Sequence, residues 1–378
     1  MVSPSLCNLD HGSSIRIRSE LRALESAQIQ VSLCSYRTGN SIGSKGYEIP
    51  ILPNFIKPGP TPHRIYLDPQ LACIAMNAAM HARPHIIHTH HNEGPLVSAL
   101  TRKAFRVPLI MDLQGSISSE LEFSGIFRRN RRIYNAFGYI EHLSQNLADH
   151  IIVSSPLLKK LVKRFTSERS ITVIADCVDV SYFYPRQKDT RLMNRLKIPM
   201  DRLVVVYLGS LAKVQGVDLL LRAIQIAIRS NNGLHFVVMG FPCEEYYRSQ
   251  SRKLGIADHV TFTGRVPYSE APMYLSIGDL AISAKRRSSE SNGKILNYMA
   301  MGIPTILFDN ENNRFLAGDS SIYAEEETSE SLAEAIGRAA SDKELRQKAM
   351  EIGIQRARFH FSPTQMKENL VSVYKQYW

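Results

Sequence analysis

The stretch from residue 282 to residue 308, ISAKRRSSESNGKILNYMAMGIPTILF, contains a complete strand, loop, helix and strand unit. It begins at the end of an apolar run that includes Ile282, which is typical of a short buried strand. A basic, serine-rich loop follows, and we expect a helix from near Lys294, an end to that helix at Gly302 and a strand over residues 305–308. Strands that alternate with helices predict a parallel sheet covered on both faces.

The loop of this unit carries positive charge next to the start of the helix. Lys285 and Arg286 lie in the loop, and the backbone N–H groups of Asn292 and Gly293 lead into the helix. Unpaired N–H groups, the positive end of a helix dipole and fixed cations all favour an anion at such a position, and a diphosphate fits best. We therefore predict that Lys285 and Arg286 bind a diphosphate.

The helix ends in Met-Ala-Met-Gly-Ile-Pro at residues 299–304, which resembles a turn of the GT-B-fold retaining glycosyltransferases of family 4. The resemblance runs almost from end to end. It implies an α/β fold with two Rossmann-like domains facing each other across a cleft, a nucleotide-diphosphate sugar as co-substrate, and no metal or other cofactor. The family's paired glutamates fall near Ser289 and Asn297 here, so the chain is more similar to a subgroup with lysine and small polar residues in their place.

Length and composition agree with two domains. A chain of 378 residues, 44% of them hydrophobic, is long enough for two cores of roughly 180 residues each. By the resemblance, we expect an acceptor-side domain over residues 1–190, a nucleotide-sugar-binding domain over residues 199–360, and a C-terminal helix over residues 361–378 that crosses back to the first domain. The five cysteines are scattered without CxxC spacing, which argues against disulfides or a zinc site and predicts a cytoplasmic protein.

The formal charge of +11 predicts an anionic partner. The sequence has no nucleic-acid-binding motif and no apolar run near the roughly 20 residues of a membrane span. An anionic membrane surface or a lipid-linked acceptor suits the charge better. Residues 157–165 separate apolar side chains from lysines, and arginines gather at residues 128–132, so we predict peripheral docking on the inner face of the membrane. A solvated helix face is the alternative.

The beginning of the chain departs from the family's pattern. Only Val2-Ser3-Pro4 could form the end of the family's first strand, so we expect either a truncated first strand or a true start upstream of Met1. The loop that follows brings Gly12 and Ser13 to the start of a helix, where they form a second candidate anion site. An ordinary capped helix is the alternative interpretation.

Polar residues follow an apolar strand of the first domain that ends near His88. His90, His91 and Glu93 come at this strand end, where open parallel sheets bind their ligands. The resemblance implies that they form a polar wall facing the sugar and the acceptor. A metal site and structural capping are the alternatives, since ligand spacing alone does not establish a rigid metal site.

The next strand leads into Asp112 and Gln114. Asp112 is the ionisable group of this loop, and we expect it either on the acceptor side or as a helix cap. The resemblance places Gln114 where the family has a histidine near the donor sugar. An amide donates a hydrogen bond to a hydroxyl but takes no proton, which fits retaining enzymes whose leaving diphosphate accepts that proton.

The second domain begins with a buried strand over residues 203–208, followed by a second phosphate loop. Gly209 and Ser210 open this loop. The resemblance places the family's arginine and lysine at Ser210 and Gln215, where this chain has neither. Lys213 is close enough to substitute for them, because a departing diphosphate needs fixed cations. A lysine on an exposed turn is the alternative.

The remaining donor contacts follow from the resemblance. Gly240 and Arg265 come at two strand ends that hold the nucleobase in the family. Asn297 takes the place of a glutamate that binds the ribose, and Lys294 lies one turn earlier on the same helix.

Together with the resemblance, these residues predict a glycosyltransferase that moves a sugar from a nucleotide-diphosphate donor; the resemblance implies retention and no metal. The acceptor is expected to be a saccharide or a lipid-linked saccharide in cell-surface polysaccharide biosynthesis. The alternatives are a GT-B nucleotide-sugar epimerase and a catalytically silent subunit that binds the nucleotide sugar. Predicted catalytic residues are Gln114, Lys213, Lys285 and Arg286; predicted donor-binding residues are Gly12, Ser13, Gly209, Ser210, Gly240, Arg265, Asn292, Gly293, Lys294 and Asn297; predicted acceptor-side residues are His90, His91, Glu93 and Asp112.

Overall fold

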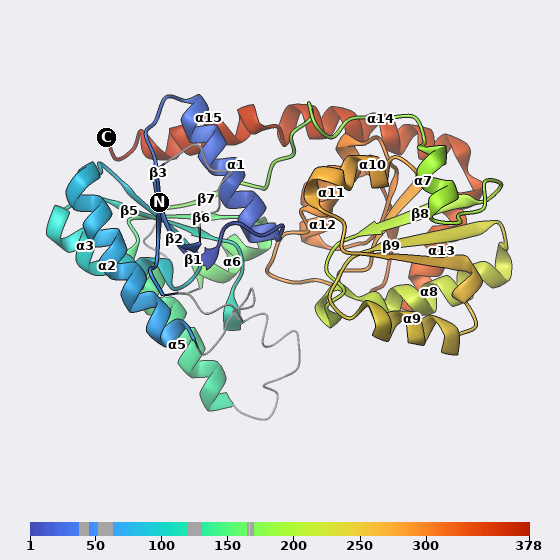
Figure 1. Ribbon diagram of the computed structural model, residues 1–378, viewed down its shortest axis with the longest axis horizontal. Coiled ribbons are helices and arrows are strands. Elements are labelled where there is room, and N and C mark those ends of the chain that lie inside the picture. The colour runs from blue at the N-terminus through green and yellow to red at the C-terminus, as the bar shows by residue number, and fades with distance from the viewer. Residues whose placement is uncertain (38–44, 52–62, 119–130, 165, 167–169) are drawn as a thin grey trace. The chain divides into compact units, whose positions relative to one another are not determined.

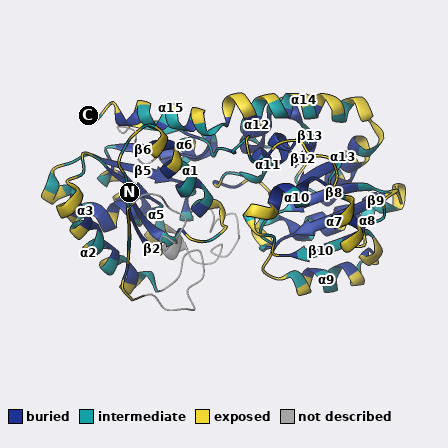
Figure 2. Ribbon diagram, turned by 45° about the horizontal axis from the view of Figure 1, so that its top comes forward, coloured by how far each residue is buried: buried dark blue, intermediate teal, exposed yellow. Residues whose placement is uncertain are grey.

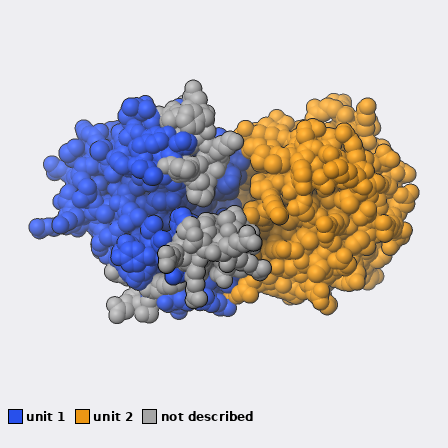
Figure 3. All heavy atoms as spheres, turned by 90° about the horizontal axis from the view of Figure 1, so that it is seen from below, with its two compact units in different colours: residues 1–177, 288–291, 363–378 blue, residues 178–287, 292–362 orange. Residues whose placement is uncertain are grey.

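The computed structural model describes residues 1–37, 45–51, 63–118, 131–164, 166 and 170–378 (Figure 1). These residues form two compact units, each a Rossmann-like layer structure around one parallel sheet. The first unit contains residues 1–177, 288–291 and 363–378, and the second contains residues 178–287 and 292–362 (Figure 3). The first unit therefore ends before the polar segment near residue 190 at which the sequence placed the boundary.

The sheet of the first unit has, among the described residues, the strand order β3-β2-β1-β4-β5-β6-β7. Its first strand occupies the middle of the sheet, between β2 and β4, and runs from Val2 to Leu6. The strand thus extends two residues beyond the Val2-Ser3-Pro4 segment expected from the sequence. The strands are β1 (Val2–Leu6), β2 (Ser32–Arg37), β3 (Lys45–Glu48), β4 (Ile87–His90), β5 (Leu109–Leu113), β6 (His150–Val153) and β7 (Ser170–Val173).

Helices cover both faces of this sheet, because successive side chains of a buried strand point to opposite faces. On β5, Ile110 packs in the cluster of α1 and α15, whereas Leu109 and Met111 pack in the cluster that includes α2. Figure 2 shows the buried strands between helices with exposed outer sides. The helices are α1 (Gly12–Ser26), α2 (Arg64–Ala82), α3 (Gly94–Phe105), α5 (Arg131–Leu147), α6 (Pro156–Lys163) and α15 (Pro363–Tyr374).

Helix α6 does not have a free apolar side. Leu157, Leu158 and Val162 are buried, and Leu158 and Val162 belong to the core of the first unit. The amphipathic pattern of residues 157–163 therefore reflects packing against the sheet, and the prediction that this apolar side docks on a membrane is wrong. Arg128 and Arg129 lie outside the described residues, as do the side chains of Arg131 and Arg132. Within the described chain, no helix has the length and apolar character needed to span a membrane.

The second unit has the strand order β10-β9-β8-β11-β12-β13 among its described residues. Helices α8 and α13 pack together, as do α11 and α14. The strands are β8 (Leu203–Leu208), β9 (Leu234–Met239), β10 (Val260–Gly264), β11 (Leu280–Ser283), β12 (Thr305–Phe308) and β13 (Ser321–Ala324). The helices are α7 (Thr190–Arg195), α8 (Val217–Ser230), α9 (Glu244–Lys253), α10 (Ala271–Leu275), α11 (Lys294–Ala300), α12 (Glu311–Ala317), α13 (Ser329–Ser341) and α14 (Lys343–His360).

The predicted strand, loop, helix and strand unit is confirmed as β11, α11 and β12. Helix α11 begins at Lys294 and buries Leu296 and Tyr298. It ends where Gly302 takes a left-handed backbone conformation with φ of 68°, which a residue without a Cβ atom adopts at low cost. The next strand then pairs in parallel with β11, with Thr305 opposite Ala281.

Candidate donor and acceptor sites

The loops at the carboxyl ends of the second sheet pack backbone against backbone. A Cβ atom on Gly240 would lie 1.9 Å from the carbonyl oxygen of Gly209, so the loops after β8 and β9 need glycine at this contact. Gly216, with φ of 74°, makes the same kind of approach to the carbonyl oxygen of Ala284, after β11. Three strand ends thus meet in the region where ligands bind to open parallel sheets.

Lys294 places an amine in this region. Its Nζ donates a hydrogen bond to Oε1 of Gln215 at 2.8 Å and lies 4.6 Å from the ring centroid of Tyr207. A Cβ atom on Gly209 would lie 2.8 Å from the same Nζ, so the glycine leaves the space that the amine fills. The side chain of Lys294 therefore reaches the loop of Ser210 and Gln215, in which the resemblance implies an arginine and a lysine.

The amine of Lys294 has an unusual environment for a lysine. Burial, together with the positive charge of Lys285, lowers the pKa of Lys294 to about 7. Lys285 is itself buried at the end of β11. Two positively charged lysines that repel each other in a partly buried site favour a strongly anionic ligand. An anion offsets both the cost of burying the two charges and the repulsion between them.

The other predicted cations of this region differ from these two. Arg286 and Lys213 have exposed side chains. Lys213 begins a short 3-10 helix, η1 (Lys213–Gln215), that turns the loop toward α8. The structure thus brings together Lys285 and Lys294, and leaves Arg286 and Lys213 at the surface.

Asn292 was predicted to bind the donor, but its amide is used within the protein. Asn292 is buried, and its Nδ2 donates to Oγ of Ser283 at 3.2 Å and to Oδ1 of Asn313 at 3.1 Å. These bonds hold the loop that precedes α11 to the end of β11. The side chain of Asn292 thus has a structural role, whereas the donor contact predicted for its backbone N–H stays a prediction. Gly293 forms the N-cap of α11.

Two groups suited to a nucleoside lie at the edges of the same region. Phe241 follows β9 with an exposed ring, and the guanidinium carbon of Arg265, after β10, lies 5.0 Å from the ring centroid. Asn297 on α11 accepts a long hydrogen bond of 3.4 Å from the hydroxyl of Tyr268. The pair of Phe241 and Arg265 offers a stacking surface, for which the aromatic ring at residue 241 was the available sequence signal.

In the first unit, the loop after β5 contains an unpaired amide. Nε2 of Gln114 is buried and has no hydrogen-bond partner among the described residues. Residues 288–291 pack beside this loop: the backbone N–H of Ser116 donates to Oγ of Ser289 at 3.0 Å. A Cβ atom on Gly115 would lie 2.9 Å from Cγ of Glu290, so this contact also needs glycine.

Gly12 and Ser13 begin α1, as expected for a helix N-terminus. The side chain of the N-cap residue, His11, makes no capping hydrogen bond, and a Cβ atom on Gly12 would have no other atom within 4 Å. The loop is thus open around Gly12.

His91 and Glu93 follow β4, and Glu93 forms an ion pair with Arg64 of α2.

The assignment of His90 and Asp112 to an acceptor-facing wall is wrong. Both side chains are completely buried on the sheet face covered by α1 and α15. Although burial alone raises the pKa of the Asp112 carboxyl, the charge of Arg16 brings that pKa well below its usual value. The ion pair between Asp112 and Arg16 has an N–O distance of 2.8 Å, so these residues form part of the interior.

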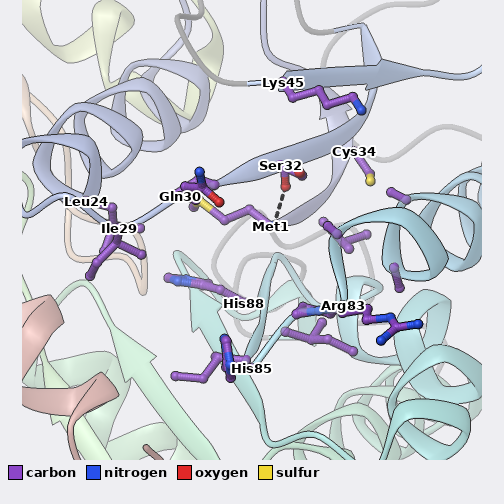
Figure 4. Close-up of a pocket in the computed structure, with 18 of the residues that line it drawn as sticks. Met1, Leu24, Ile29, Gln30, Ser32, Cys34, Lys45, Arg83, His85 and His88 are labelled. Atoms are coloured by element: carbon purple, nitrogen blue, oxygen red, sulfur yellow. Dashed lines mark hydrogen bonds between the residues drawn. The ribbon is translucent and has the colours of Figure 1, made fainter.

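The first unit also has a cavity of about 1130 Å³ (Figure 4). It is lined by Met1, Ser32, Arg83 and His85, from the beginnings of strands and the end of α2. The amine of Met1 donates to the carbonyl oxygen of Ser32 at 2.6 Å. Since ligands of open parallel sheets bind at the opposite, carboxyl ends, this cavity is not the expected substrate site.

Comparisons with known proteins agree with this arrangement. The model of the family described as Glycosyltransferase Family 4 matches residues 11–182, and that described as Glycosyl transferases group 1 matches residues 188–356. The chain therefore belongs to the GT-B-fold glycosyltransferases of group 1 and family 4.

Two curated relatives are about a quarter identical to this chain over the aligned part of their sequences. Spore coat protein SA of Bacillus subtilis is 25% identical over an alignment of 247 residues, which covers 61% of this chain and 66% of that protein. D-inositol 3-phosphate glycosyltransferase of Corynebacterium diphtheriae is 25% identical over an alignment of 337 residues, which covers 82% of this chain and 75% of that protein. The chain thus spans less than two thirds of the first of these relatives.

Solved structures show the same fold at lower identity. Sucrose-phosphate synthase from Thermosynechococcus elongatus matches with a TM-score of 0.84 and 17% identity, over 99% of this chain and 98% of that chain. The Anabaena protein HepE in complex with UDP-glucose matches with a TM-score of 0.75 and 15% identity, over 99% of both chains. At these identities the similarity establishes two Rossmann-like domains of the GT-B type.

Proposed function

We propose that this protein is a retaining glycosyltransferase whose second unit binds the diphosphate of a nucleotide sugar through Lys294 and Lys285. The observation that carries the proposal is the position of Lys294 Nζ, 2.8 Å from Gln215 in the loop after β8. This amine restores a cation to a loop that lacks the family's arginine and lysine. The Anabaena relative in complex with UDP-glucose supports a nucleotide sugar as the donor.

The proposed chemistry places positive charge where negative charge develops. As the bond between the sugar and the diphosphate breaks, the departing diphosphate gains charge, and fixed cations that meet this charge are usually the largest contribution to catalysis. Lys294 takes up a proton as the anion approaches, since burial and Lys285 make its free amine only weakly basic. The leaving diphosphate then accepts the proton of the incoming hydroxyl, and no metal is needed for this step.

Gln114 is proposed to orient the donor sugar in the first unit. Its unpaired Nε2 donates a hydrogen bond to a sugar hydroxyl, which satisfies a buried polar group that is otherwise costly. An amide has no proton to exchange at neutral pH, so Gln114 positions the sugar and does not act as a base.

The acceptor is proposed to be a lipid-linked saccharide on an anionic membrane. The supporting feature is a set of exposed apolar side chains on two helices that pack together, here named the α3–α5 apolar surface. The exposed cations Lys103 of α3 and Arg106, which follows this helix, lie in the same segment. Apolar side chains beside cations match the interface of an anionic bilayer. The surface consists of Leu96 and Leu100 of α3 and of Tyr139, Ile140 and Leu143 of α5.

Turnover of the donor tests the proposed function. A thermal-shift screen with UDP, GDP, ADP and their sugars identifies the nucleotide, because a ligand that binds only the folded state raises the unfolding temperature. Incubation of the selected sugar donor with candidate lipid-linked and free saccharides then shows whether a glycoside forms. NMR of the new linkage distinguishes retention from inversion.

The two alternatives predict different products. An epimerase converts the nucleotide sugar to its epimer without any acceptor, and a silent binding subunit leaves the donor intact while still binding the nucleotide. Donor that remains unchanged with every acceptor, despite measurable binding, would overturn the glycosyltransferase proposal.

A further inference from the structure

The interior of the first unit contains a cluster of four side chains that carry metal-binding atoms. They are Glu20 of α1, His88 and His90 of β4, and Asp112 of β5, and one ligand atom of each lies within 4.8 Å of the others. All four are at most 2% exposed. The two histidines share one face of the strand because they are two residues apart, and His90 pairs in register with Asp112.

Several polar atoms of this cluster have no hydrogen-bond partner among the described residues. They are Nε2 of His88, both ring nitrogens of His90, both carboxylate oxygens of Glu20 and Oδ1 of Asp112. Oε2 of Glu20 lies 3.6 Å from Nε2 of His88 and 3.8 Å from Nε2 of His90, which is beyond hydrogen-bonding distance. Buried polar groups are rarely left unsatisfied, so these atoms, gathered in one buried cluster, call for a common partner.

The charges around the cluster favour a cation. The guanidinium of Arg16 contacts Glu20, Asp112 and Asp176, and it is the positive charge that these three carboxylates share. Three carboxylates thus compete for one guanidinium, and a divalent cation would add positive charge beside the two that belong to the cluster.

We propose that Glu20, His88, His90 and Asp112 bind a structural Zn²⁺ ion. Zinc prefers four ligands at the corners of a tetrahedron, with bonds of about 2.0–2.2 Å that put neighbouring ligand atoms roughly 3.3 Å apart. The separations of 3.6 and 3.8 Å between Glu20 and the two histidines lie close to that distance, while the four ligand atoms together lie within 4.8 Å of one another, so the ligands must draw closer to complete the tetrahedron. Because all four ligands are buried and no position faces solvent, the site stabilises the fold and takes no part in sugar transfer.

The surroundings of the cluster fit this assignment. A metal-binding histidine usually has its second nitrogen held by a hydrogen bond, and Nδ1 of His88 lies 2.6 Å from the hydroxyl of Tyr374 on α15. Arg16 holds the other oxygen of Asp112, Oδ2, at 2.8 Å from Nη2. His88 and Tyr374 also line the cavity of Figure 4. The ion would tie α1, β4, β5 and α15 together.

The first experiment measures zinc in the full-length protein. The chain is purified from zinc-containing medium and its metal content is determined by mass spectrometry. We expect about one zinc per chain, and we expect the metal-free protein to regain it with a higher unfolding temperature. Metal-free wild type whose unfolding temperature and metal content do not change with added zinc would overturn the proposal and leave shared protons as the partner of these atoms.

Variants locate the ion. His90→Gln removes one ligand and is expected to lower zinc affinity by roughly 100-fold or more, whereas Tyr374→Phe removes only the support of His88 and lowers it by about 10- to 100-fold. His150→Gln is the matched control, because His150 is a buried histidine of the neighbouring sheet region that bonds to Thr172 and not to the cluster. It should retain the metal.

Cobalt provides a readout that does not depend on stability. Co²⁺ bound by the four ligands in tetrahedral geometry gives strong visible absorption, which His90→Gln should abolish and His150→Gln should preserve. If the His90→Gln variant keeps the wild-type spectrum, zinc binds elsewhere and the assignment fails.

Discussion

Lys294 Nζ lies 2.8 Å from Gln215 Oε1, so an amine supplied by helix α11 reaches the loop that follows β8. Gly209 makes this possible, because any side chain there would occupy the volume of the amine.

The first prediction is that Lys294→Met weakens donor binding. Loss of a charge-assisted hydrogen bond costs about 1.5–3 kcal/mol, which corresponds to a roughly 10- to 150-fold rise in Kd for the nucleotide sugar. Isothermal titration calorimetry measures this change. Lys213→Met is the matched control, since its side chain is exposed, and its Kd should stay within about twofold of wild type. Equal losses in the two variants would remove Lys294 from the site.

The second prediction is that Lys294 takes up a proton when the donor binds. The pKa of Lys294 is lowered to about 7 in the free protein, and a bound diphosphate raises it again. Above pH 7 the complex therefore holds more protons than the free protein, and donor affinity should fall by up to about tenfold per pH unit. Calorimetry at pH 8 in buffers of different ionisation enthalpy should show uptake approaching one proton on binding UDP-glucose.

The same measurement has internal controls. At pH 6 the amine is already protonated, so uptake should be close to zero. In Lys294→Met, uptake at pH 8 should disappear, whereas in Lys213→Met it should persist. Uptake that survives in Lys294→Met would assign the proton to another group.

The third prediction is that Asn297→Leu raises the donor KM by roughly tenfold or more, with a smaller effect on kcat. Asn297 is proposed to bind the ribose, and its replacement leaves a hydroxyl unpaired at a cost of about 1–3 kcal/mol. Tyr268→Phe is a useful comparison, because it removes the partner of Asn297 without removing the amide. Steady-state kinetics that are identical for Asn297→Leu and wild type would contradict the assignment.

The fourth prediction is that Arg16→Met destabilises the first unit. In the metal-free protein, the variant leaves the carboxylates of Asp112 and Glu20 buried without their positive partner, and breaking a buried ion pair costs about 3–5 kcal/mol. Urea unfolding should show this loss. Arg22→Met, on the exposed side of the same helix, should change the free energy of unfolding by no more than about 0.5 kcal/mol.

The local elements around the donor loop could be predicted from the sequence because their signals are local. The helix start at Lys294, the end at Gly302 and the strand at residues 305–308 all follow from periodicity and glycine placement, and the structure confirms them. The direction of the Lys294 side chain could not be predicted in this way, since it depends on Gly209, which is 85 residues away in the sequence.

The predictions that proved wrong failed because a local sequence pattern does not show what covers a strand or a helix. The spacing of His88 and His90 shows that they share a face of a strand, but it does not show which face, or that α1 and α15 cover it. Because the structure buries both side chains, His90 and Asp112 do not face an acceptor. Likewise, the amphipathic pattern of residues 157–165 is the same for a helix packed on a sheet and for a helix on a membrane, and only the structure distinguishes the two.

The final prediction is reversible binding of the protein to anionic membranes through the α3–α5 apolar surface. Leu100 is 71% exposed and Tyr139 is 63% exposed, although side chains of this size are usually covered in water. Cations near an anionic bilayer each contribute on the order of 1 kcal/mol, and salt screens this attraction. Co-sedimentation should therefore show binding to anionic vesicles at low salt, weaker binding at high salt and little binding to neutral vesicles. Leu100→Asp should reduce the bound fraction, whereas Met200→Asp, at an exposed apolar residue of the second unit, should leave it unchanged. Wild-type protein that stays in the supernatant with anionic vesicles at low salt would exclude membrane docking and favour a free saccharide as the acceptor.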